Sequence, residues 1–230
     1  MEKTCYMCEK EATSLEHVPP KCLFPEKKDL PEGIDFRKNL ITVPSCDEHN
    51  SQKSKDDEYL LFLLLSAKKG NIDKERHLNT KFTRAVNRTP HVYNSFCQNK
   101  SHFLSFEEGD INVESSFFVD IPRFENAIKH IALGLYYNHY GKKWNGSFRM
   151  FSSEMINEKS FNSYKANQDI HETASKIACY FEKKEARGEN PQIFMYKWHT
   201  EGEDGHAIFM DFYEGFEITV VLRAFIKSVS

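Results

Sequence analysis

Cys5-Tyr6-Met7-Cys8 near the start of the chain and Cys46-Asp47-Glu48-His49 further along are the stretches that decide its fold. Each stretch offers two metal-ligating side chains separated by two residues. Two such pairs can meet around one tetrahedral ion and fasten the start of the chain to the start of a later helix. The spacing therefore predicts a structural zinc site formed by Cys5, Cys8, Cys46 and His49.

The remaining cysteines, Cys22, Cys97 and Cys179, have no partner at ligand spacing. A secreted disulfide framework would carry cysteines at a higher density. We therefore interpret these three as buried thiols.

The segment that contains the two pairs, residues 1–58, is rich in Cys, His, Pro, Asp and Lys and short of long apolar runs. A unit this small buries little core, so a metal is expected to stabilise it. Short strands are predicted at Ser14–Val18 and Leu40–Val43. A helix is predicted over Ser51–Lys69, apolar on nearly every face at its end and therefore buried, with Gly70 ending it.

Beyond Pro90 the chain becomes rich in aromatic residues. Apolar residues at helical spacing predict a helix over Phe124–Tyr140, closed by Gly141. A second helix is predicted over Ile170–Arg187, stopped at Gly188. Alternating or β-branched content predicts strands at Gln192–Trp198, Ala207–Phe212 and Phe216–Leu222.

A turn at Tyr213–Gly215 is expected between the last two strands. The pattern as a whole predicts an α+β protein in three parts. These are an N-terminal zinc-stapled domain at 1–68, a basic connecting segment at 69–90 and a C-terminal aromatic-rich α+β module at 91–230.

The composition, 40% hydrophobic and 28% charged, is that of an ordinary globular protein. The longest apolar run, Leu60–Leu65, is far shorter than the ~20 residues that span a bilayer. The first residues, Met1–Cys5, turn polar at once, unlike a signal peptide. We therefore expect no membrane partner and a cytoplasmic location.

The net charge of −3 gives no support by itself to nucleic-acid binding. Between Lys68 and Arg88, however, seven cations face only Asp73 and Glu75. Phosphate groups favour such a patch, and a solvated helix face is the alternative interpretation. Candidate nucleic-acid contacts in it are Lys69, Arg76 and Arg84.

Three further motifs lie within or just after the zinc ligands: Glu16-His17-Val18-Pro19-Pro20-Lys21, Arg37-Lys38-Asn39-Leu40 and Asn50-Ser51-Gln52-Lys53. With the nested ligand pairs, this order resembles the HNH endonuclease family, which is built on a β-β-α-metal finger. The resemblance covers about Cys5 to Asp57. It implies a metal-dependent hydrolase that cleaves phosphodiester bonds of DNA.

Phosphodiester hydrolysis needs a base that activates water and a cation that neutralises charge on the phosphate. His17 is the natural base, since the ordinary pKa of histidine lies near neutrality. The resemblance implies that Glu16 and Asn50 hold a catalytic Mg²⁺ or Mn²⁺ through oxygen ligands. It also implies that Asn39 orients the surroundings of the base and that Lys53 contacts phosphate, which makes His17, Asn39 and Asn50 the catalytic candidates.

Two features depart from the commonest family pattern. The acidic residue is Glu16 where Asp is usual, and Glu16 and His17 point to opposite sides of a regular strand, so a shared site requires a bent backbone. The fourth zinc ligand is His49 instead of Cys. If His49 instead bound the catalytic ion, zinc would keep three cysteines, with Cys22 as a possible fourth.

Family context suggests bacterial restriction or antiviral defence, by analogy alone. Two alternatives belong to other functional classes. One is a non-catalytic zinc module that binds nucleic acid or protein, in which zinc matters and Glu16, His17 and Asn50 do not. The other is an effector subunit that is inactive alone and switched on by a partner. Besides nucleic acid, the expected partners are a partner protein or further copies of this chain.

Overall fold

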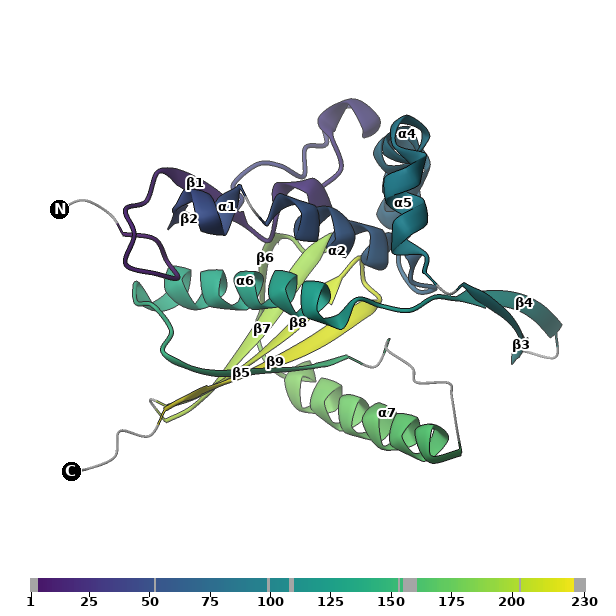
Figure 1. Cartoon of the computed structure of the whole chain (residues 1–230). Helices are drawn as coiled ribbons and strands as arrows, with labels where there is room; N and C mark the ends of the chain where they lie inside the picture. Colours follow the sequence, from purple (N-terminus) through teal and green to yellow (C-terminus); the bar gives the residue numbers. More distant parts are fainter. Residues whose placement is uncertain are drawn as a thin grey trace.

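The computed structural model describes residues 4–51, 53–98, 100–107, 110–152, 154, 161–202 and 204–225. The described elements stack in layers (Figure 1). The N-terminal hairpin and the first helices lie on one side of a long central helix, α6, and a five-stranded sheet lies on its other side. A second long helix, α7, covers the far face of that sheet.

The N-terminal unit is a β-β-α arrangement, as predicted. Strands β1 (Ser14–Val18) and β2 (Ile41–Ser45) pair antiparallel, with His17 opposite Thr42. The loop between them contains two short 3₁₀ turns, η1 (Lys21–Leu23) and η2 (Lys27–Asp29). Helix α1 (Asp47–Asn50) follows β2 directly. The prediction for β1 is confirmed in full, and β2 begins one residue later than expected and runs on to Ser45.

Helix α2 (Ser54–Ser66) is shorter than the predicted Ser51–Lys69 at both ends. Its residues from Tyr59 to Leu65 are all buried. This confirms the expectation that a helix apolar on every face is enclosed by the rest of the protein.

The basic connecting segment is mostly helical. It contains α3 (Ile72–His77), a π-helical stretch η3 (Leu78–Phe82) and α4 (Thr83–Arg88), and α5 (Pro90–Phe96) follows. The Asn71 side chain caps α3 by accepting hydrogen bonds from the backbone N–H groups of Asp73 and Lys74. The segment also supplies Phe82 to the core, so it is packed structure and more than a linker.

Strands β3 (Ser101–Glu107) and β4 (Asp110–Ser116) form a separate hairpin. In Figure 1 it projects away from the rest of the molecule. This hairpin was not predicted from the sequence. Its register places Leu104 opposite Val113, and both side chains are exposed.

Helix α6 (Ile121–Tyr140) confirms the predicted central helix, with its start three residues earlier. The Asp120 side chain caps the start by accepting from the Arg123 backbone N–H. Gly141 ends the helix in the left-handed conformation, at φ 64°. The helix packs on β1, β2 and α2 and therefore joins the N-terminal unit to the sheet.

The sheet has the order β5-β9-β8-β7-β6 and is antiparallel throughout. Its strands β7, β8 and β9 confirm the three predicted ones, whereas β5 and β6 were not predicted. Tyr213 and Glu214, both at φ 55°, form the expected turn between the last two strands. The strand bounds are Gly146–Ser152 for β5, Ala186–Asn190 for β6, Phe194–Glu201 for β7, Gly205–Phe212 for β8 and Phe216–Ala224 for β9.

Helix α7 (Phe161–Glu182) lies on the sheet face opposite α6, where the Phe181 ring stacks on Phe209 with 5.7 Å between centroids. The predicted helix ran to Arg187, which is wrong at its end. Gly188 belongs to β6, at φ 130°, where the pairing with β7 shifts register. That glycine marks a bulge in an edge strand and not a helix stop.

The buried hydrophobic residues form one cluster that extends from Cys5 to Leu222, apart from Phe181 and Phe209, which stack on each other between α7 and the sheet. The three parts of the chain therefore share a core. Among the described residues, none of the helices has both the length and the apolar character that a membrane crossing needs. The fold is a mixed α+β structure with the Cys/His cluster at its N-terminal side.

Candidate metal centre and the residues around it

The four predicted zinc ligands meet in the structure. Their ligand atoms all lie within 4.8 Å of one another. The Cys8 and Cys46 Sγ atoms are 3.8 Å apart, and His49 Nδ1 lies 3.5 Å from Cys5 Sγ and 3.3 Å from Cys46 Sγ. Zinc–sulfur bonds of ~2.3 Å in a tetrahedron put ligand atoms ~3.8 Å apart, so three thiols and one imidazole at these distances fit a structural zinc ion.

Local backbone structure holds the ligands in place. The first knuckle is closed by the Thr4–Glu11 bridge and by the Cys5 backbone N–H, which donates to the Lys10 carbonyl at 2.9 Å. The second knuckle is the beginning of α1, where the His49 and Asn50 backbone N–H groups donate to the Cys46 carbonyl. A tight turn and a helix start thus face each other across the site.

Backbone dipoles favour a thiolate at this site. Burial raises the pKa of the Cys5 thiol, but backbone hydrogen bonds from Met7, Cys46 and Cys8 outweigh burial and leave that pKa lowered. Burial raises the pKa of the Cys8 thiol, and the neighbouring sulfurs of Cys46 and Cys5 raise it further. A bound cation would remove this repulsion between sulfurs, since metal ligation needs deprotonated thiols.

The structure places His49 with the three cysteines and Cys22 elsewhere. Burial lowers the pKa of His49 and so favours the neutral imidazole, the form that binds metal. The Cys22 thiol instead donates to the Asp57 carbonyl at 3.7 Å. The Cys3His set is therefore the one that can hold an ion, and the alternative with Cys22 is not the arrangement seen.

The C-terminal part of the chain holds the first knuckle from outside. Lys143, just beyond α6, donates to the Cys8 carbonyl at 2.7 Å and pairs with Glu9 at 2.9 Å. On α6 itself, the buried His130 ring lies 5.8 Å from that of His49. The metal centre is consequently fastened to the helix that carries the sheet.

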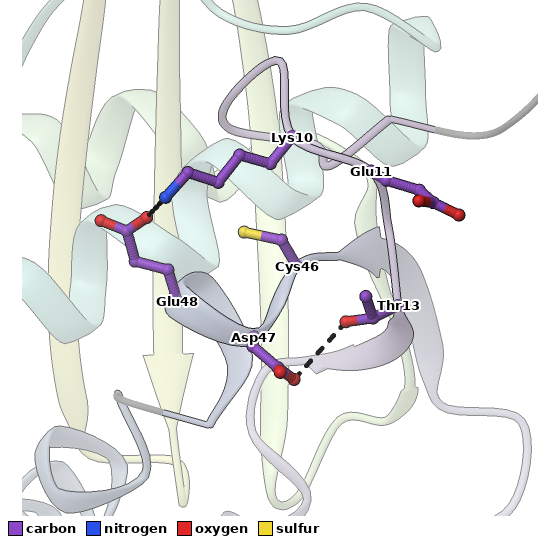
Figure 2. Close-up of a pocket in the computed structure, with 6 residues that line it drawn as sticks. All are labelled: Lys10, Glu11, Thr13, Cys46, Asp47 and Glu48. Atoms are coloured by element: carbon purple, nitrogen blue, oxygen red, sulfur yellow. Dashed lines mark hydrogen bonds and ion pairs between the residues drawn. The ribbon is translucent and has the colours of Figure 1, made fainter.

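An open pocket lies beside the cluster and is lined by Lys10, Glu11, Thr13, Cys46, Asp47 and Glu48. Figure 2 shows the Cys46 side chain between the Lys10–Glu48 ion pair and the Thr13–Asp47 hydrogen bond. Carboxylates outnumber cations in this lining. The pocket therefore gives an approach to the ligand cluster and is a poor place for a phosphate group.

Glu16, a residue of β1, is buried, and its carboxylate has three side-chain partners. Its carboxylate accepts hydrogen bonds from the Tyr6 hydroxyl and the Ser45 hydroxyl, each at 3.2 Å, and pairs with the Lys53 ammonium at 2.6 Å. The same ammonium pairs with Asp57 at 3.0 Å. Burial raises the pKa of Glu16, and the Lys53 charge opposes that rise.

Lys53, the predicted phosphate contact, is therefore an interior residue, with only 3% of its side chain exposed. Sequence reasoning overlooked the network around it. Asp57 stands four residues after Lys53, a spacing that pairs opposite charges on a helix and was the available signal. Nothing local marked Tyr6 and Ser45 as partners.

His17 lies on the other side of β1, half-buried, as its position next to Glu16 in a regular strand requires. The strand keeps its pairing through Val18, so the bend that would bring both side chains to one point is not seen. Burial lowers the pKa of His17, and the positive charges of Lys21 and Arg37 lower it further. Both effects favour the neutral imidazole of His17.

Asn50 shares the inner side of β1 with Glu16, because its side-chain N–H donates to the Ser14 hydroxyl at 2.7 Å. Asn39 lies just before β2, exposed, with φ 53°. Asparagine tolerates that left-handed conformation, so its observed role is in the turn. His17 and Asn50 therefore lie on opposite sides of β1.

The three predicted basic contacts are all ion-paired. Lys69 pairs with Glu154 at 3.5 Å and is otherwise well exposed, and Arg76 pairs with Asp73. Arg84 makes a bidentate pair with Asp29. The charge of this stretch is therefore partly compensated in the folded chain.

Comparison of the chain with protein-family models, with curated proteins and with solved structures found no match.

Proposed function

We propose that this protein is an endonuclease of the HNH type that hydrolyses phosphodiester bonds in DNA. The observation that carries the proposal is the position of His17 on β1, within a β-β-α unit fastened by the nested Cys3His cluster. A rigid strand that presents a neutral imidazole is a suitable carrier for a general base.

The chemistry assigned to His17 follows from its surroundings. A neutral imidazole nitrogen accepts the proton of a water molecule as that water attacks phosphorus. The lowered pKa of His17, caused by burial and then by Lys21 and Arg37, keeps the accepting form populated at neutral pH. The same two cations attract the phosphate that the water must reach.

A divalent ion held by Glu16 and Asn50, which the family resemblance implies, does not fit these residues as they lie. The Lys53 ammonium already neutralises Glu16, and neither partner of that pair is more than 3% exposed. Mg²⁺ also keeps several waters when it binds, which needs room. The proposed reaction therefore contains no step through such an ion, and the assay below measures whether cleavage depends on Mg²⁺ or Mn²⁺.

The test is incubation of the zinc-loaded protein with supercoiled plasmid and with single-stranded DNA, in parallel with Mg²⁺, with Mn²⁺ and without either. We expect cleavage, and His17→Ala should reduce its rate ~10²–10⁴-fold, the contribution of a general base. His171→Ala, at an exposed position on α7, is the matched control and should cleave normally. A folded, zinc-loaded His17→Ala protein that cuts at the wild-type rate would overturn the assignment.

A second candidate function is a non-catalytic zinc module that binds nucleic acid or protein. The observation that favours it is that Lys53, Tyr6 and Ser45 all bind the Glu16 carboxylate. This carboxylate is therefore not free to bind a catalytic metal ion. Under this candidate no variant of His17 changes any activity, while loss of a zinc ligand abolishes binding. An effector subunit is distinguished by cleavage that begins only when a cell extract is added.

A further inference from the structure

A group of cations converges on one half-buried carboxylate in the loop that follows His17. Glu26 has Lys28 at 2.7 Å, Arg37 and Arg84 at 3.9 Å and Lys81 at 4.0 Å. The only further acid among the described ion pairs of this group is Asp29, which pairs with Arg84. We call these six residues the Glu26 cluster; it contains four cations and two carboxylates.

The excess of positive charge is held in a partly desolvated place. Side chains of Lys81 and Arg37 are 23% and 21% exposed. Burial lowers the pKa of Lys81 and Arg37 lowers it further, against the effect of the nearby acids. Two cations therefore remain close together without enough negative charge, which is the condition that an added anion relieves.

The cluster is also fixed before any ligand arrives. The Arg37 guanidinium donates two hydrogen bonds to the Phe24 carbonyl, at 3.0 and 2.9 Å. Lys81 donates to the Cys22 carbonyl at 3.5 Å, from the π-helical stretch η3. These anchors hold the charged groups in place, so less conformational entropy is lost when they bind an anion.

Arg37 joins the cluster to the proposed base. Its charge lowers the pKa of His17 on one side and of Lys81 on the other. The Glu26 cluster therefore lies within electrostatic reach of His17 through Arg37. It is assembled from the loop after β1 and from the helices of the basic segment, which lie far apart in the sequence.

We propose that the Glu26 cluster is a binding site for a backbone phosphate of nucleic acid, next to the phosphate that His17 faces. In the free protein the Glu26 carboxylate occupies the place that this backbone phosphate would take. Guanidinium and ammonium groups are the side chains that recognise phosphate, with Arg able to bind two oxygens at once. Several cations beside the proposed base suit a chain of regularly spaced phosphates better than a single free anion. This inference rests on the proposed function, because it takes the His17 side of β1 to be the substrate side.

The experiment measures binding without cleavage. Fluorescently labelled single-stranded and double-stranded oligonucleotides are titrated with His17→Ala protein without divalent ions, over a range of salt concentrations. In that background Arg84→Gln and Lys81→Gln should each weaken binding and reduce the salt slope by about one unit. Glu26→Gln should strengthen binding, because it removes the competing carboxylate. Lys176→Gln, which removes an exposed cation on α7, is the matched control and should change nothing.

Zinc content and circular dichroism confirm that each variant is folded, and Arg84 is exposed enough that its loss leaves the core intact. Inorganic phosphate serves as a competitor in a separate arm. If it displaces the oligonucleotide at equal phosphate concentration, the site binds free phosphate and the nucleic-acid assignment fails. An unchanged salt slope in both cation variants, or weaker binding by Glu26→Gln, also overturns the proposal.

The result separates this inference from the proposed function. Variant-sensitive binding by a protein that never cleaves DNA would support the phosphate site and contradict the nuclease. If cleavage depends on His17 but is unchanged by substitutions at Lys81, Arg84 and Glu26, the proposed function is supported and the proposed phosphate site is contradicted.

Discussion

Val18 of β1 lies directly against the backbone of α6 at Gly134, so closely that a Cβ at residue 134 would stand 2.5 Å from Val18 Cγ2. Both residues are buried, Val18 at the end of β1 and Gly134 within α6. The absence of a side chain at Gly134 thus lets β1 pack directly on the backbone of α6.

Gly134→Ala tests that contact by the sign of its effect. In an open helix interior the change stabilises a protein by roughly 0.5–1 kcal/mol. Here the added methyl group overlaps Val18, so we expect a loss of about 1–3 kcal/mol in the free energy of unfolding, measured with urea. Val18→Ala in the same protein should recover part of the loss, and a stabilised Gly134→Ala protein would contradict the packing.

The zinc prediction concerns stoichiometry. Elemental analysis of protein prepared without chelator should find about one zinc per chain. Cys46→Ala should lose the metal and unfold the N-terminal unit, because metal binding is coupled to folding. Cys179→Ala is the control and should keep its zinc, because Cys179, which was predicted to be buried, is an exposed thiol outside the cluster. If the wild-type protein kept its fold without metal, the prediction that zinc has a structural role would be wrong.

The network of Glu16, Lys53 and Asp57 predicts a large single-site effect. Lys53→Met leaves two carboxylates buried without their cation, which should cost about 3–5 kcal/mol of unfolding free energy. Lys55→Met, at an exposed neighbour, should cost little. Adding Glu16→Gln to Lys53→Met should restore part of the stability, and purely additive losses in this cycle would argue against the pairing.

A pH dependence follows from His77. Its Nδ1 lies 2.8 Å from the Tyr213 hydroxyl, which itself donates to the Leu23 carbonyl, and burial lowers the pKa of His77 to about 3. The unfolded chain binds this proton near pH 6.5, so the stabilisation is complete above that pH and is lost as the pH falls toward 3. We expect about 2–3 kcal/mol to be lost between pH 6.5 and 4.5.

His77→Gln should remove that part of the pH dependence, whatever its effect at neutral pH. Urea unfolding of both proteins at several pH values measures the difference. His171→Gln, at an exposed histidine, is the control and should keep the wild-type dependence. Parallel curves for wild type and His77→Gln would show that His77 does not titrate with folding.

Elements whose own apolar side chains explain why they are buried could be predicted from the sequence. Helix α6 repeats apolar residues at helical spacing and ends in a glycine, and strands β8 and β9 alternate or enrich apolar residues. Strand β6, with the sequence Ala-Arg-Gly-Glu-Asn, has no apolar pattern. It is a strand because β7 offers it an edge to pair with, which is information that no local window contains.

The same distinction applies to the site, where some residues could be predicted from local sequence and others could not. Cysteine and histidine at ligand spacing predicted the cluster because metal coordination restricts which residues serve and how they are spaced. The spacing of Lys53 and Asp57 signals an ion pair, but nothing near Lys53 in the sequence signals that the pair is buried. The interior position of Lys53 depends on Glu16 arriving from β1 and on Asp57 one turn further along α2, so the tertiary fold decides whether that lysine meets solvent or carboxylates.

Helix α2 buries every residue from Tyr59 to Leu65, and α6 covers it from the side of the sheet. A fragment that ends near residue 68 would lack α6 and would expose the apolar side chains of α2 to water. The N-terminal unit is thus not a cassette that gene fusion or recombination can transplant intact. Any inheritance or engineering of this zinc-fastened hairpin has to carry α6 with it, and α6 brings the sheet.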